Sequence, residues 1–218
     1  MTEPQPSYSA WVYKTSRVLL LCWLRWKFKL KVSGENNVPE QGGVIIASNH
    51  ASYLDPPLLA CPLKHRVVRF MARDTLFINP MARWYFFRTG VVPLSRDRGD
   101  VGAIKSAIQL LKQGQCVGLF PEGTRTLDGN LQSAKGGIGF LIAKAEVPVV
   151  PVYISGSFEA YPKGSKKMKS HPITVQYGPA IQPDELDIKN ERGKTDFDAI
   201  GRLIMDRIEL LKNTPFPT

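Results

Sequence analysis

The feature that most constrains the fold is a series of short apolar runs that follows Gly34 and alternates with stretches of helical periodicity. Short apolar runs bounded by glycine, proline or polar residues predict buried strands. Apolar residues recur at helical spacing from Val101 to Leu111 and from Phe197 to Leu211, which predicts helices there. Strands that alternate with helices predict an α/β sandwich with a mostly parallel central sheet. The predicted strands are 43–48, 67–71, 90–94, 116–120, 147–154 and 173–177.

The segment from Trp11 to Lys31 contains no proline, glycine or acid and predicts a helix. Its longest apolar run, residues 18–24, is too short for the roughly 20 residues that cross a bilayer. Tryptophans and six bases surround that run, which favours a helix lying in the interface of an anionic membrane leaflet. The alternative is a helix that packs on the domain while its bases are solvated. We therefore predict a membrane-interface segment, 1–34, and a second domain, 35–218.

The 218 residues include 29 Lys and Arg against 19 Asp and Glu, a formal net charge of +10. Such an excess indicates a polyanionic partner: nucleic acid, anionic lipid or a phosphorylated substrate. Most of it lies in residues 11–34, which hold six bases and no acid, and in residues 157–171, which hold four lysines against Glu159. No nucleic-acid-binding motif is evident, and the most basic segment is rich in Trp and Leu, so a lipid surface is favoured over nucleic acid.

Cys22, Cys61 and Cys116 lie far apart in apolar surroundings and lack the spacing of a zinc or redox site. They predict reduced core thiols in a reducing compartment. The first residues lack the basic start and cleavage site of a secretory signal peptide. Combined with the interfacial helix, these features predict a peripheral or monotopic protein on the cytoplasmic face of the inner (plasma) membrane.

Polar side chains follow two of the predicted strands at their carboxyl ends. Strand 43–48 runs into His50 and Asp55, and strand 116–120 runs into Glu122 and Arg125. If these parallel strands are neighbours, both loops reach the same edge of the sheet. An imidazole beside a carboxylate can hold one tautomer and remove a proton from a hydroxyl. Taken alone, Asp55 before a proline also fits a helix cap, with His50 bonded to backbone.

Three cations follow at the same predicted edge: Arg96 after strand 90–94, Arg125, and Lys135 at the glycine-rich start of a helix. Guanidinium groups and helix N-termini both bind anions, so the three predict a phosphate-binding set, although each alone would commonly be a surface charge. No Gly-x-Ser-x-Gly elbow or nucleotide-binding loop is present, and the three histidines are too scattered for a metal site. The predicted chemistry is direct: His50 activates a substrate hydroxyl that attacks a carbonyl.

These residues resemble the glycerophospholipid acyltransferase family, most closely the bacterial 1-acyl-sn-glycerol-3-phosphate acyltransferases. His50 and Asp55, separated by four residues and preceded by Asn49, are similar to the first motif. Gly90 and Arg96 resemble the second. The third is matched by Phe-Pro-Glu-Gly-Thr-Arg at 120–125 and the fourth by 147–152. Where many members have Lys-x-Glu-Leu before the second motif, this chain has Arg-Asp-Thr-Leu at 73–76, which removes that glutamate.

The resemblance implies an αβ-acyltransferase fold and transfer of a fatty acyl group from acyl-CoA or acyl-ACP to the free hydroxyl of lysophosphatidic acid, giving phosphatidic acid. It implies no cofactor, no metal and no covalent acyl-enzyme, with His50 as general base and Asp55 as its partner. Acceptors such as glycerol-3-phosphate or another lysolipid are alternatives, and a nucleic-acid-binding domain is a remote one. The implied substrate-binding residues are Arg96, Glu122, Gly123, Thr124, Arg125 and Lys135.

Overall fold

The computed structural model describes residues 8–73, 77–94 and 99–217. Within these ranges seven strands form one sheet: β1 (Lys31–Ser33), β2 (Val44–Ser48), β3 (Val68–Arg73), β4 (Val92–Leu94), β5 (Cys116–Leu119), β6 (Val149–Ser155) and β7 (Thr174–Tyr177). Their order across the sheet is β1-β7-β6-β2-β5-β3-β4. Every neighbouring pair is parallel except β6 with β7, which is antiparallel. The predicted α/β fold with a mostly parallel sheet is therefore confirmed.

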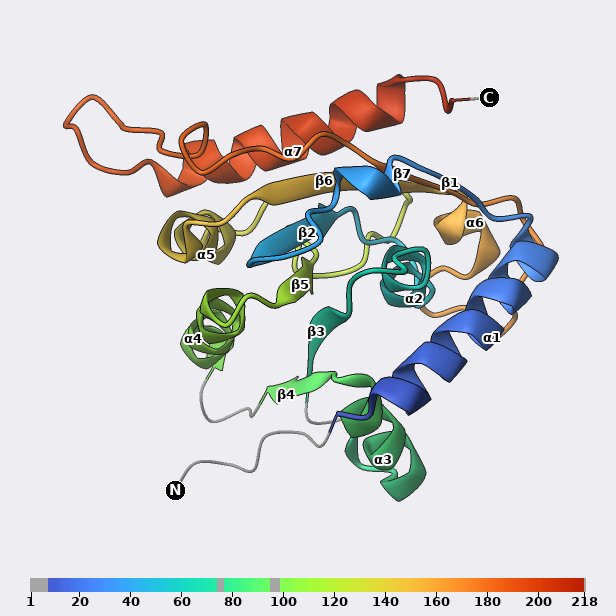
Figure 1. Cartoon of the computed structure of the whole chain (residues 1–218). Coiled ribbons are helices and arrows are strands. Elements are labelled where there is room, and N and C mark those ends of the chain that lie inside the picture. The colour runs from blue at the N-terminus through green and yellow to red at the C-terminus, as the bar shows by residue number, and fades with distance from the viewer. Residues whose placement is uncertain (1–7, 74–76, 95–98, 218) are drawn as a thin grey trace.

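Helices cover both faces of this sheet (Figure 1). They are α1 (Ala10–Phe28), α2 (Asp55–Ala60), α3 (Pro80–Thr89), α4 (Gly99–Lys112), α5 (Gly137–Ala145), α6 (Ser157–Ala160) and α7 (Phe197–Asn213), with a 3-10 turn at Glu35–Asn37. Strand β2 is buried along its whole length because both of its faces are covered. Val44 and Ile46 join the cluster formed with α1 and α2, whereas Ile45 and Ala47 join the cluster formed with α4, α5 and α7.

Helix α1 packs on the domain by one face and leaves the other exposed. Leu21, Leu24 and Phe28 belong to the core beneath the sheet, so the packing that the alternative interpretation required is present. On the opposite face Trp11 and Trp26 are 75% and 79% exposed. No described helix combines the length and apolar character needed to cross a bilayer. The division of the chain near residue 34 stays a prediction.

Several short elements were not predicted from the sequence. Helix α3 has no buried residue, so it lacks the apolar stripe on which a periodicity argument depends. Its start is fixed instead by Asn79, whose Oδ1 accepts hydrogen bonds from the Met81 and Ala82 amides at 2.9 and 3.2 Å. Helix α2, helix α6 and strand β1 are each too short to show a period. The lysine-rich segment 157–171 begins with α6.

The cysteine prediction is confirmed at two positions and wrong at the third. Cys61 and Cys116 are buried free thiols, and burial raises the pKa of each to about 12. Cys22 is exposed because it lies on the outward face of α1. An apolar sequence neighbourhood did not distinguish the two faces of a helix that is apolar on both.

Replacing Leu24 by Ala tests whether α1 belongs to the folded core. Leu24 is fully buried, so this substitution should lower the free energy of unfolding by about 2–5 kcal/mol. Leu19→Ala on the exposed face of the same helix should change it by no more than about 0.5 kcal/mol. Urea denaturation of the two variants measures the difference. Equal effects would contradict the packing of α1 on the core.

Candidate active site

The two predicted loops meet because β2 and β5 are parallel neighbours. Ile46 lies opposite Gly118 in their register, so both strands deliver their following residues to the same edge of the sheet. The backbone amide of His50 donates a hydrogen bond to Glu122 Oε1 at 3.0 Å. The Thr126 amide donates to the His50 carbonyl at 2.8 Å. The convergence expected from the sequence is therefore present at hydrogen-bond distance.

His50 and Asp55 form a buried pair at the start of α2. His50 Nδ1 lies 2.8 Å from Asp55 Oδ2, and the Asp55 side chain is fully buried while that of His50 is 17% exposed. The same oxygen accepts hydrogen bonds from the Ala51 and Ser52 amides at 2.6 and 2.7 Å. Asp55 thus binds the loop that precedes α2 and makes no capping bond to the helix. With Nδ1 bonded to Asp55, Nε2 is the nitrogen left to take a proton.

Aromatic stacking fixes the plane of the imidazole. The His50 ring lies on Phe120 with centroids 3.9 Å apart and an interplanar angle of 13°. Phe120 in turn faces Phe70 of β3, with centroids 6.2 Å apart at 11°. Phe70 fits there because position 118 is glycine: a β-carbon at Gly118 would lie 2.3 Å from the Phe70 ring. Two aromatic rings therefore connect the histidine to β3, a contact that the motif pattern did not predict.

Asn49 fastens the end of β2 to the neighbouring strand β6. Its Oδ1 accepts from the Ile154 amide at 2.8 Å and its Nδ2 donates to the Ile154 carbonyl at 3.0 Å. The side chain is buried, and its amide oxygen and amide nitrogen both bond to the backbone of one residue. Sequence reasoning noted Asn49 only as the residue before the histidine; its bonds hold His50 in place relative to β6.

Glu122 is buried and only partly satisfied. Its side chain is 2% exposed, Oε1 accepts from the His50 amide, and Oε2 has no hydrogen-bond partner among the described residues. Burial raises the pKa of Glu122 to about 7, although the His50 and Gln132 amides oppose that rise. At neutral pH the carboxyl group can therefore either accept or donate a hydrogen bond. A substrate hydroxyl would satisfy the free oxygen.

The predicted cations Arg125 and Lys135 lie around the same loop. The Arg125 guanidinium stacks on Tyr53, 3.5 Å from the ring centroid, and its buried Nη1 lacks a hydrogen-bond partner among the described residues. The Lys135 amide donates to the Pro121 carbonyl at 3.0 Å. Gly123 adopts a φ of +64°, and a β-carbon there would lie 2.7 Å from Lys135 Cδ, so the lysine chain crosses the turn. Thr124 is exposed beside them; Arg96 lies outside the described residues.

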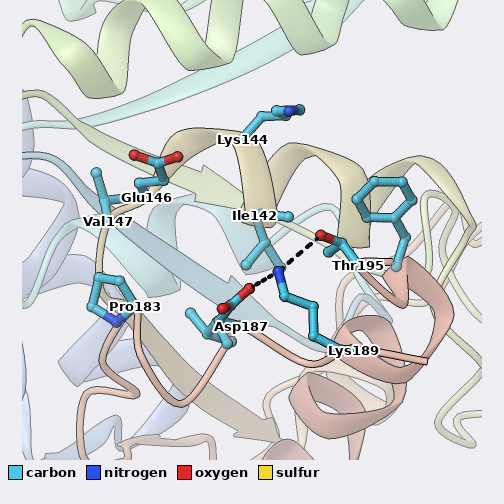
Figure 2. Close-up of a pocket in the computed structure, with 11 residues that line it drawn as sticks. Ile142, Lys144, Glu146, Val147, Pro183, Asp187, Lys189 and Thr195 are labelled. Carbon is cyan, nitrogen blue, oxygen red and sulfur yellow. Dashed lines mark hydrogen bonds and ion pairs between the residues drawn. The ribbon is translucent and has the colours of Figure 1, made fainter. Parts of the chain in front are cut away.

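A separate pocket of about 330 Å³ lies beside the amino end of β6, away from this edge of the sheet (Figure 2). Lys189 Nζ pairs there with the Asp187 carboxylate and lies 3.4 Å from Thr195 Oγ1. These side chains satisfy one another and contact none of the residues around His50. The described residues contain no cluster of His, Cys, Asp and Glu able to hold a metal ion.

Comparison with known proteins gives a consistent result. The Acyltransferase family model matches residues 29–155. The chain is 36% identical over 147 residues to the chloroplastic 1-acyl-sn-glycerol-3-phosphate acyltransferase of Arabidopsis thaliana, covering 66% of this chain and 41% of that protein. It is 29% identical over 160 residues to the Bacillus subtilis 1-acyl-sn-glycerol-3-phosphate acyltransferase, covering 72% of this chain and 79% of that protein. The chain thus spans less than half the length of the Arabidopsis relative.

Among solved structures, the 1-acyl-sn-glycerophosphate acyltransferase of Thermotoga maritima superposes with a TM-score of 0.75 at 25% identity. The superposition covers 95% of this chain and 82% of that one. The family model includes both loops that meet at His50, and the fold is shared over nearly the whole chain. This chain belongs to the acyltransferase family.

Proposed function

We propose that this chain transfers a fatty acyl group from a thioester donor to the free hydroxyl of 1-acyl-sn-glycerol-3-phosphate, which gives phosphatidic acid. The observation that carries the proposal is the bond between His50 Nδ1 and the buried Asp55 carboxylate, near Glu122 Oε2, which has no hydrogen-bond partner among the described residues. The names of the Arabidopsis and Bacillus relatives support this acceptor.

In the proposed reaction His50 Nε2 takes the proton of the acceptor hydroxyl as its oxygen attacks the thioester carbonyl carbon. The carbon–sulfur bond then breaks, and the leaving thiolate takes the proton from the imidazolium. Asp55 stabilises the imidazolium because its carboxylate is held by two backbone amides beside Nδ1. No acyl group is bound covalently to the protein, and no step requires a cofactor.

The acceptor's phosphate would bind the Arg125 guanidinium and the Lys135 ammonium, with Arg96 proposed as a third ligand. Glu122 Oε2 would hold the glycerol part. Gly123 and Thr124 belong to the turn between these groups and would line the acceptor site. Glycerol-3-phosphate offers the same phosphate and hydroxyl groups, so an acceptor panel distinguishes it from a lysolipid.

An apolar cavity of about 230 Å³ supports a fatty acyl substrate. It lies between the amino-terminal half of α1, α2, α3 and β3, and its walls include Ser16, Pro56 and Phe70. Pro56 adjoins Asp55, and Phe70 is joined to His50 through the stacked Phe120 ring. An acyl chain in this cavity would therefore have its carbonyl end near the histidine.

The exposed face of α1 supports binding to a membrane surface. It presents Trp11, Val18, Leu19 and Trp26 together with the exposed bases Lys14 and Arg25. Helix α3 contacts α1, with the Ser9 amide donating to the Arg88 carbonyl at 3.0 Å. Around α3 more apolar side chains are exposed: Ile78, Met81 and Trp84. Such a surface, apolar with basic edges, suits the interface of an anionic leaflet on the cytoplasmic face of the inner membrane.

His50→Ala should reduce the turnover of palmitoyl transfer to lysophosphatidic acid by about 10²- to 10⁴-fold, because the general base is lost. His65→Ala is the matched control, since the His65 ring binds the Val38 carbonyl far from the site. Circular dichroism checks that both variants fold. Full activity of a folded His50→Ala protein would contradict the mechanism.

Ser16→Phe should shift the preferred donor toward shorter acyl chains, since the added ring would occupy the apolar cavity. We expect kcat/KM for palmitoyl transfer to fall roughly tenfold relative to octanoyl transfer. Ser16→Ala, which leaves the cavity open, should keep the original preference. An unchanged preference in Ser16→Phe would place the acyl chain elsewhere.

The double variant Leu19→Glu/Trp26→Glu should bind vesicles of phosphatidylglycerol and phosphatidylcholine at least about tenfold more weakly, because two apolar contacts are lost and two negative charges gained. The control Val101→Glu/Leu210→Glu makes the same change at exposed residues of α4 and α7, which cover the other face of the sheet. Vesicle sedimentation measures both. Equal binding by the two double variants would refute membrane docking through α1.

A further inference from the structure

A second open, polar groove of about 610 Å³ is lined by residues other than those of the candidate active site. One wall is residues 128–130. The other comprises α6 and the segment that follows it, including Pro162, Lys169 and His171. Gly129, with a φ of +84°, lies against Phe158: a β-carbon there would be 3.0 Å from that ring.

Both walls are attached to the polypeptide within two residues of His50. Thr126 donates its amide to the His50 carbonyl at 2.8 Å, and its hydroxyl donates to Asp128 Oδ1 at 2.7 Å. On the other wall the Ser52 hydroxyl donates to the Tyr161 carbonyl at 2.6 Å, and Ser52 forms a bridge with Pro162. The groove therefore lies between segments that are hydrogen-bonded to the loop carrying His50.

The groove and the apolar cavity lie on different sides of the histidine. The cavity includes residues of β3, whereas the groove includes α6, which follows β6. Strand β2, which precedes His50, lies between β6 and β5 in the sheet, and β3 lies beyond β5. A thioester with its carbonyl at His50 and its acyl chain in the cavity thus has the groove available for the arm that carries the sulfur.

The outer edge of the groove is strongly basic. We call residues 163–169 the lysine loop; its lysines are all exposed and form no ion pair with a described residue: Lys163, Lys166, Lys167 and Lys169. The loop is held next to the basic end of α1, because the Ser170 hydroxyl donates to the Lys27 carbonyl at 2.7 Å. The positive surface therefore extends from the groove to the carboxyl end of α1.

We propose that the groove binds the phosphopantetheine arm of the acyl donor and that the lysine loop docks an acidic acyl carrier protein. This inference rests on the proposed function. Only Lys169 of the four lysines lines the groove, so the others are placed to meet a broad acidic surface instead of the compact phosphates of coenzyme A. Met168 is the one exposed large apolar side chain of the loop, so the loop is less apolar than the α1 face with its exposed Trp and Leu side chains.

Reversing charge on the loop tests the docking of the carrier protein. In Lys163→Glu/Lys166→Glu/Lys167→Glu, which leaves the groove-lining Lys169 unchanged, kcat/KM for palmitoyl-acyl carrier protein should fall at least about tenfold, because favourable charge pairs become repulsive. With palmitoyl-CoA and lysophosphatidic acid in neutral detergent micelles it should change less than about twofold. Lys112→Glu/Lys144→Glu/Lys194→Glu is the control, with the same charge change at exposed lysines of α4, α5 and the segment before α7.

Filling the groove tests the binding of the arm itself. Glu159 is exposed on the groove wall. Glu159→Trp should lower kcat/KM for both donors, because both carry phosphopantetheine. Glu209→Trp, the same change at an exposed position of α7, should lower neither. An unaffected Glu159→Trp enzyme would overturn the assignment of the groove.

The remaining outcomes are also decisive. If kcat/KM of the lysine-loop variant falls equally with both donors, the loop binds coenzyme A. If it falls only when the acceptor is presented in anionic vesicles, the loop binds lipid. Either result overturns carrier docking, as does an unchanged kcat/KM. Calorimetric titration with holo-acyl carrier protein measures docking without turnover. The wild-type protein could bind holo-acyl carrier protein, with the lysine-loop variant losing that binding, and yet acylate no lysophosphatidic acid. That result would uphold docking and refute only the proposed function.

Discussion

The parallel pairing of β2 with β5 is the constraint on which the site depends. The register that sets Ile46 opposite Gly118 ends both strands at one edge, and it brings the backbone of His50 to the carboxylate of Glu122. Both strands are buried on both faces, so neither can shift its register without repacking the core. A shift of one residue would move every core side chain to the opposite face, so the position of the histidine is determined by the core.

Two buried carboxylates at this edge have different surroundings and different properties. Asp55 is bound by two backbone amides and the imidazole through one oxygen, which gives it a fixed orienting role. Glu122 accepts from the His50 backbone amide instead, and burial raises its pKa to about 7. Each carboxylate keeps one oxygen without a hydrogen-bond partner among the described residues, Asp55 Oδ1 and Glu122 Oε2. Asp55 is thus bonded to the imidazole, whereas Glu122 can accept or donate a hydrogen bond to a ligand.

The surface around the site is divided by chemistry. The outward face of α1 and its neighbour α3 is apolar with basic edges, the cavity between α1 and β3 is apolar, and the groove beside α6 is polar with a lysine-rich edge. In the proposed function these regions would receive a lipid acceptor, an acyl chain and a water-soluble carrier from separate sides. The net charge of the chain is concentrated where such partners would approach.

The sequence by itself determined the fold class, the positions of the main strands along the chain and the residues at the carboxyl ends of β2 and β5, because short apolar runs and motif spacing are local properties. Tertiary structure alone decided which face of α1 is buried, where α3 lies, and that Phe70, Phe120 and Asn49 hold the histidine. Those contacts join residues far apart in the chain, and α3 has no buried stripe to reveal it. Cys22 was assigned to the core for the same reason: burial depends on what packs against a helix, which periodicity does not state.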